Sequence, residues 1–216
     1  MSKSLGNFID LAKLDHYVST YGLDALRYFF ASQGPLGAAD RDFADARFVE
    51  VYNADLANNF GNLVQRATTL IDRNAGGALP EPGDLGAAEQ TLRAEAASLP
   101  ERVAAAFDRF AVDEALAAVT DLVRAANRYA EETKPWMLAK DGGPALATSL
   151  YHLAEAARLA AWYLTPFMPA TAPEAHRRLS GREPEAGLGV FGAVPPGAPV
   201  TGGTPLFPRA QVAAAP

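Results

Sequence analysis

The chain has 216 residues, 49% of them hydrophobic, which is enough to bury a large core. Its formal net charge of −6 argues against a protein that coats nucleic acid through clustered lysine and arginine, so we expect any RNA contact to be local. It has no cysteine, which excludes disulfides and thiolate metal sites and fits a reducing cytosol. No apolar run approaches the ~20 residues of a membrane helix, and the start of the chain does not resemble a secretory signal.

The spacing of apolar residues predicts a chain that is helical nearly throughout. After a short strand-like entry from residue 8, Asp10 is suited to cap a first helix and Gly22 to end it. A loop of Gly, Pro and Asp is expected over 34–42. Further helices are expected from 24 to about 34, and over 43–74, 87–109 and 112–132. A short turn follows at 135–138. After a break at 141–144, one helix is expected to end at 164 and a last short helix near 179.

The expected helix over 43–74 is unusually long. Its apolar residues recur every three to five positions, which predicts one buried stripe. Gly61 and the pair Asn58-Asn59 favour a bend within it, and Pro100 is expected to split or kink the helix over 87–109. Strand signals are nearly absent, so we predict an all-α helical bundle with short connections. The tail over 181–216 is rich in Gly, Pro and Ala and is expected to be extended, docked or disordered.

Ser2, Lys3 and Ser4 form a small polar segment at the start of the chain. A mobile ammonium between two hydroxyls suits phosphate binding, and Gly6 allows close approach of the backbone. Taken alone, the segment also fits an ordinary polar terminus.

Asn58, Asn62 and Arg66 recur at every fourth position, which stacks them on one face of a helix. One interpretation is a solvated polar face. The other is reading of base edges, because an amide presents a donor beside an acceptor and a guanidinium is a planar fork. Unpaired loop bases are where RNA sequence is recognised.

Trp136 follows Lys134 and Pro135 at a helix break. A tryptophan there is either a packing residue or a platform on which an unpaired base stacks. By contrast, Trp162 lies within a helix among aliphatic residues, and we assign it to packing.

The first residues resemble a known signature. The run from Met1 to Asn7 is similar to the second signature of class I aminoacyl-tRNA synthetases, Lys-Met-Ser-Lys-Ser, continued by Leu-Gly-Asn. The leading lysine of that signature is absent here. The segment Asp24–Phe29 is widespread in these enzymes, and we interpret it as structural.

Three further segments resemble the methionyl-tRNA synthetases. These are residues 55–66, residues 126–136 and the tail segment 205–209. The resemblance covers essentially the whole chain. It implies a signature loop and stem-contact segment (1–42) from the end of a Rossmann-type catalytic domain, an anticodon-binding bundle (43–180) and a C-terminal tail (181–216).

The resemblance also implies residue roles. Ser2, Lys3 and Ser4 would bind ATP, and Lys3 would be catalytic because it stabilises the charge on the leaving pyrophosphate. The anticodon CAU would be bound by Asn62, Arg66 and Trp136, with Glu131 close to the anticodon loop. The implied partners are tRNA(Met) and, through the catalytic domain, methionine and ATP with Mg²⁺. The implied location is the cytoplasm, with no DNA or membrane partner.

Much of such an enzyme is not found in the sequence. No His-Ile-Gly-His signature, methionine pocket, metal site or Rossmann sheet is recognised, and His16, His152 and His176 are isolated residues expected to be on the surface or satisfied. We therefore expect the C-terminal part of a methionine–tRNA ligase that is inactive alone and binds no cofactor. The alternatives are a stand-alone tRNA-binding module, a bundle without an RNA role, or part of the cysteine, isoleucine, leucine or valine enzyme.

Overall fold

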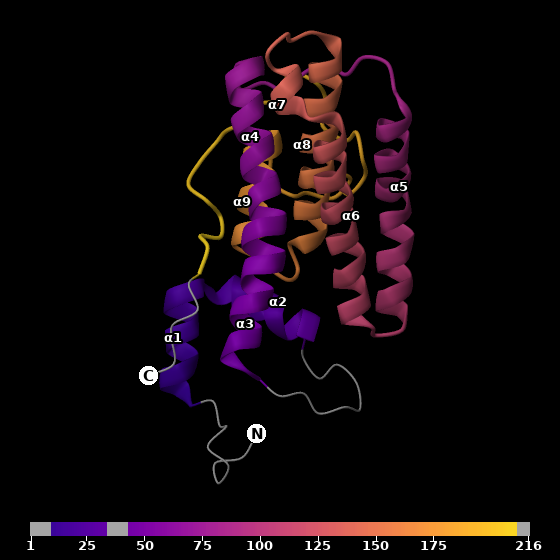
Figure 1. Cartoon of the computed structure of the whole chain (residues 1–216). Coiled ribbons are helices and arrows are strands. Elements are labelled where there is room, and N and C mark those ends of the chain that lie inside the picture. Colours follow the sequence, from indigo (N-terminus) through magenta and orange to yellow (C-terminus); the bar gives the residue numbers. More distant parts are fainter. Residues whose placement is uncertain (1–9, 34–42, 211–216) are drawn as a thin grey trace.

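The computed structural model describes residues 10–33 and 43–210, and within them the chain forms helices and no β-strand (Figure 1). The helices are α1 (Leu11–Tyr21), α2 (Leu23–Gln33), α3 (Asp45–Val51), η2 (Tyr52–Gly61), α4 (Asn62–Ala75), α5 (Ala87–Asp108), α6 (Val112–Thr133), α7 (Pro135–Leu138), α8 (Pro144–Leu164) and α9 (Thr171–Ser180). The predicted all-α class is confirmed. None of these described helices has the length and apolar character needed to cross a membrane.

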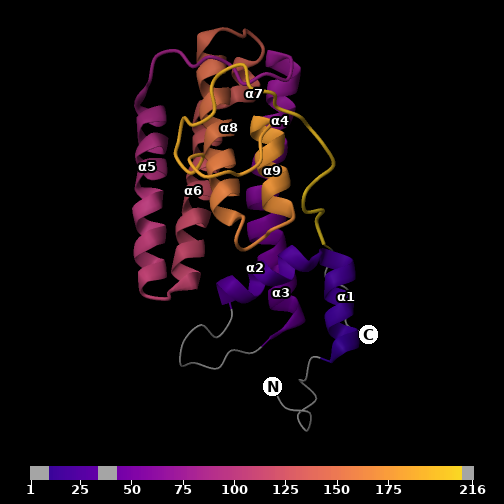
Figure 2. The same ribbon diagram turned by 180° about the vertical axis from the view of Figure 1, so that it is seen from behind.

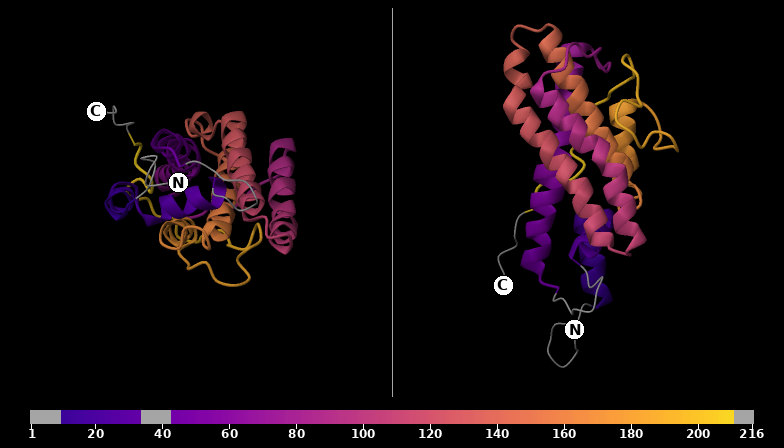
Figure 3. Two further views of the ribbon diagram at one scale, coloured as in Figure 1. Left: turned by 90° about the horizontal axis from the view of Figure 1, so that it is seen from below. Right: turned by 90° about the vertical axis from the view of Figure 1, so that its right-hand side faces the viewer.

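Helix α8 is the centre of the bundle. It packs against α4, α5, α6 and α9, and its residues 148–161 are all buried. Helices α5 and α6 form a long antiparallel hairpin beside it, while α1, α2 and α3 lie at one end of the molecule and α7 lies at the other (Figures 1 and 3). A mostly apolar helix that is buried on all sides takes such a central position, and its few polar residues must find partners there.

Local signals place several helix ends where the sequence predicted them. The Asp10 carboxylate accepts a hydrogen bond from the Lys13 backbone N–H at 2.8 Å and caps α1, which ends at Gly22 with φ +87°. At the end of α4, Gly76 adopts the left-handed conformation with φ +60°. Helix α5 remains one helix through Pro100, so of the predicted split or kink the split does not occur.

The long helix predicted over 43–74 contains an unexpected segment. Helices α3, η2 and α4 follow one another without a break, and η2 is a π-helix of ten residues that ends at Gly61. A Cβ atom added to Gly61 would lie 2.9 Å from the Leu56 carbonyl oxygen, so glycine permits this wider winding. Side chains after the π-helix therefore point in different directions from those that a regular α-helix would give.

Two charged residues of α2 bind the bundle. The Asp24 carboxylate accepts hydrogen bonds from the backbone N–H groups of Ala170 (3.0 Å) and Thr171 (2.6 Å) at the start of α9. The Arg27 guanidinium donates to the carbonyl groups of Pro166 and Phe167. These contacts support the structural role predicted for residues 24–29.

The tail is docked over the described residues 181–210, which pass over α8 and α9 (Figure 2). A fully buried ion pair within α8 holds it: Arg158 Nε lies 2.7 Å from Glu155 Oε1. The other guanidinium nitrogens donate to the carbonyl groups of Leu188 (2.6 Å) and Val190 (2.8 Å), and Glu155 accepts from the Gly192 N–H at 2.7 Å. Because its charges are paired and hydrogen-bonded on all sides, this ion pair is tolerated in the core.

Candidate nucleic-acid interface

Three elements bring Arg66, Glu131 and Trp136 together near the α7 end of the bundle. Arg66 of α4 places its guanidinium carbon 5.2 Å from the centre of the Trp136 ring on α7. Its Nη1 atom also lies 3.1 Å from a carboxylate oxygen of Glu131 on α6. The guanidinium is thus oriented by an aromatic face and a carboxylate at once.

Trp136 reaches the surface because of the break between α6 and α7. Lys134 caps α6 in the left-handed conformation with φ +46°, and its N–H bonds the Ala130 carbonyl at 2.9 Å. Pro135 then begins α7 and is buried, whereas Trp136 is 37% exposed. An exposed indole at this position is available for stacking, which is the second of the two interpretations of Trp136.

Asn62 lies one turn before Arg66 and is exposed. It lines a groove of about 520 Å³ between η2–α4 and the tail segment 205–209. Asn58 lines the same groove, where its amide oxygen accepts a hydrogen bond from Arg209. The three residues predicted to lie on one face therefore have different surroundings. Asn58 and Asn62 line the groove, whereas Arg66 pairs with Glu131 on α6 and contacts Trp136 on α7.

Asn127 is a residue whose role the sequence did not indicate. Its side-chain N–H group donates to the Asn59 side-chain oxygen (2.7 Å), the Asn59 carbonyl (3.3 Å) and the Val123 carbonyl (3.1 Å). It thus joins the π-helix to α6 one turn before Glu131. The sequence placed Asn127 only within the segment 126–136, and nothing there indicates a contact with the distant Asn59.

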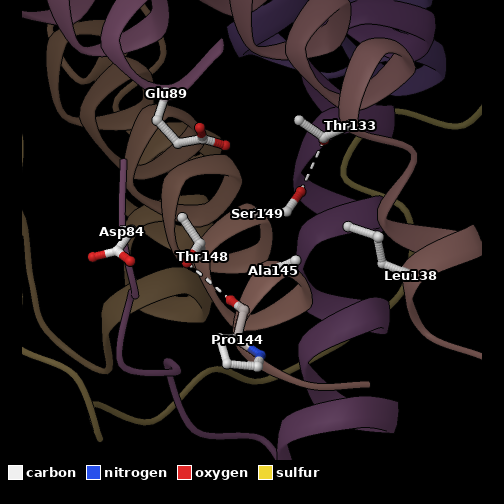
Figure 4. A pocket seen from close by; sticks show the side chains of 8 residues that line it. All are labelled: Asp84, Glu89, Thr133, Leu138, Pro144, Ala145, Thr148 and Ser149. Carbon is white, nitrogen blue, oxygen red and sulfur yellow. Dashed lines mark hydrogen bonds between the residues drawn. The ribbon is translucent and has the colours of Figure 1, made fainter. Parts of the chain in front are cut away.

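A second cavity, of about 400 Å³, lies between the linker before α5 and the start of α8 (Figure 4). It is lined by Asp84, Glu89 and Ser149, among others. Burial alone would raise the pKa of Glu89, but hydrogen bonds from the Tyr129 hydroxyl (2.7 Å) and the Gly86 N–H (2.9 Å) lower it. Its two carboxylates make this cavity unsuitable for phosphate.

The histidines do not form a catalytic cluster within the described residues. His16 is exposed, and His176 is satisfied by the Arg182 carbonyl at Nδ1 and by Arg158 at Nε2. His152 differs from the expectation, because it is fully buried and its Nε2 has no partner among the described residues. Ser2, Lys3 and Ser4, the predicted ATP-binding residues, lie outside the described residues.

Two family models match the chain, one at its N-terminal end and the other over most of the rest. A family model described as "tRNA synthetases class I (M)" matches residues 1–68. A second, described as "Anticodon binding domain of methionyl tRNA ligase", matches residues 79–211.

Curated relatives match the chain over nearly its whole length. A methionine–tRNA ligase from Caldanaerobacter subterraneus subsp. tengcongensis is 38% identical over 98% of this chain and 33% of its own length. One from Mycobacterium leprae is 36% identical over 98% of this chain and 40% of its own length. The chain therefore spans about a third of the length of the curated relatives it matches.

Part of each of two solved structures has the same fold as this chain. The free form of Mycobacterium tuberculosis methionyl-tRNA synthetase superimposes with a TM-score of 0.84 at 32% identity, covering 95% of this chain and 42% of that one. The same enzyme in complex with methionyl-adenylate gives a TM-score of 0.83 at 33% identity, covering 97% and 41%.

Proposed function

Because this chain belongs to the methionyl-tRNA ligase family and carries its anticodon-binding domain, we propose that it selects tRNA(Met) by binding the CAU anticodon. The observation that carries the proposal is the exposed Trp136 ring with the Arg66 guanidinium against it. One base stacks on the indole, and Arg66 bonds to a base edge with its planar fork. Asn62 reads a neighbouring base through its amide.

Glu131 completes this site as a positioning residue. Its carboxylate holds the Arg66 guanidinium at 3.1 Å while remaining largely exposed itself. In a chain of net charge −6, such an arrangement favours bases over backbone phosphate, because the carboxylate repels the phosphate while the guanidinium and amides recognise base edges.

The wider activity that we propose is ATP-dependent attachment of methionine to tRNA(Met), in the cytoplasm where translation occurs. Lys3, together with Ser2, Ser4 and Mg²⁺, binds the ATP phosphates. Two of these phosphates leave as pyrophosphate when the amino acid is activated. Methionine and the rest of the ATP are bound by the part of the catalytic domain that these 216 residues do not include.

The test is a binding titration of the 216-residue chain with anticodon stem-loop RNA. One RNA carries CAU in its loop, and matched RNAs carry a single changed base at each of the three positions. We expect each change to weaken binding about tenfold or more, since one mismatched base contact is worth ~1–3 kcal/mol. Equal affinity for all four RNAs would remove the base-reading role.

A further inference from the structure

The groove beside Asn62 has two walls from distant parts of the chain. One is the face of η2–α4 that carries Asn58, Gly61, Asn62 and Gln65, and the other is the tail segment 205–209. Its volume of about 520 Å³ is within the range of sites that hold small ligands. The groove adjoins the proposed anticodon site because Asn62 belongs to both.

The tail wall is fixed in place. The Tyr52 hydroxyl donates to the Pro208 carbonyl at 2.9 Å, and Asn53 makes a pair of 2.9 Å hydrogen bonds with the backbone of Ala210. Phe207 is buried against the Tyr52 ring, with 6.0 Å between the ring centres. Because these contacts order the segment beforehand, a ligand in the groove would not have to order it on binding.

Arg209 gives the groove a positive charge. It is exposed, and its Nε donates to the Asn58 amide oxygen at 2.6 Å. Within residues 10–33 and 43–210 it has no carboxylate partner, unlike Arg66, Arg102 and Arg109. Its terminal nitrogens make no hydrogen bond to the described residues and remain available as donors to a phosphate.

We propose that this groove binds one unpaired nucleotide directly next to the CAU triplet, with Arg209 on its phosphate and the Asn58 amide on its base. The inference rests on the proposed function and extends the RNA contact from three nucleotides to four. Asn58 lies one turn of helix from Asn62, so adjacent nucleotides meet adjacent amides along the same helix. The hydrogen bond from Arg209 occupies the Asn58 amide oxygen, so the amide N–H group is the part of Asn58 that we propose donates to the base.

The first test measures the salt dependence of stem-loop binding for Arg209→Ala. Loss of one phosphate contact should weaken CAU stem-loop binding roughly tenfold and reduce the slope of log K against log salt by about 0.7. The control is Arg109→Ala, an exposed arginine paired with Glu114 at the turn between α5 and α6, which lies at the opposite end of the bundle from α7 (Figure 1). If both variants show the same affinity and slope, the proposal is overturned.

The second test removes the base instead of the protein group. An abasic residue on one side of the triplet, tested on each side in turn, should weaken wild-type binding several-fold at one side. The same change should leave binding by Asn58→Ala unaffected. Equal loss in both proteins, or no loss at either side in the wild type, would refute the groove site. Arg209→Ala should keep the preference for CAU that the wild type shows. If the wild type itself binds CAU and changed loops equally, it is the proposed function that fails.

Discussion

At the scale of single residues, the exposed indole of Trp136 is the part of the interface most open to test. Its ring lies against Arg66, whereas Trp162 packs against Gly189 and donates its indole N–H to the Glu185 carbonyl at 2.9 Å. We predict that Trp136→Ala weakens CAU stem-loop binding by ~1–3 kcal/mol, which is the contribution of one stacked base. Trp162→Phe serves as the control and should bind as the wild type does. Equal affinity for Trp136→Ala and wild type would assign the indole to packing.

Substitution of Arg66 by lysine distinguishes the contribution of its charge from that of its planar shape. Lysine keeps the positive charge and loses the planar fork. We predict that Arg66→Lys reduces the ratio of affinities for the CAU loop and a changed loop about tenfold, while the salt dependence of binding stays the same. Stem-loop titrations at two or three salt concentrations measure both quantities. A variant that keeps the full ratio would show that Arg66 acts through charge alone.

At the scale of elements, the π-helix ends at Gly61, where there is little room for a side chain. A Cβ atom at Gly61 would meet the Leu56 carbonyl at 2.9 Å and the Phe207 ring at 3.7 Å. We predict that Gly61→Ala lowers the free energy of unfolding by about 1–3 kcal/mol, because extra volume in a packed position is destabilising. Gly202→Ala is the matched control, since a Cβ there meets no atom within 4 Å. Urea unfolding of the two variants measures the difference, and equal stability would contradict the account.

The sequence predicted those elements that local chemistry determines. Asp10 and Gly22 act on their own helix, so the bounds of α1 were predictable. The π-helix was not predicted, because apolar residues that recur every three to five positions do not distinguish its wider winding from that of an α-helix. In the site, Arg66 and Trp136 were found from local patterns and a resemblance, whereas the partnerships of Asn127 and Arg209 arise only when distant segments meet.

At the scale of the whole molecule, buried His176 links stability to pH. Burial, together with the charge of Arg158, lowers the pKa of His176 to about 4. Its Nε2 accepts a hydrogen bond from Arg158 at 3.3 Å, so protonation there would remove the acceptor and place two cations together in the core. The ordinary histidine pKa is about 6.5, so between pH ~6.5 and ~4 the unfolded chain binds more protons than the folded one. The stabilisation from neutral His176 is therefore complete above pH ~6.5 and is lost as pH falls toward 4.

We predict that the free energy of unfolding falls by about 2 kcal/mol between pH 7 and pH 5 because of His176. His176→Gln should show a smaller fall, and His16→Gln, which changes an exposed histidine, should behave as the wild type. The His176 variant keeps part of the dependence, since burial lowers the pKa of His152 as well. Urea unfolding at the two pH values measures the effect, and an unchanged slope in His176→Gln would contradict the assignment.

Fluorescence of Trp136 itself tests the central claim most directly. The chain contains two tryptophans, so Trp162→Phe leaves Trp136 as the only indole. Because a base stacked on the ring quenches its emission, titration with the CAU stem-loop should give saturable quenching at the concentrations where binding occurs. A stem-loop with one changed anticodon base should give the same quenching only at about tenfold higher concentration. Binding of the CAU loop without any change in Trp136 emission, or identical curves for both RNAs, would contradict the claim that this indole and its arginine read the anticodon.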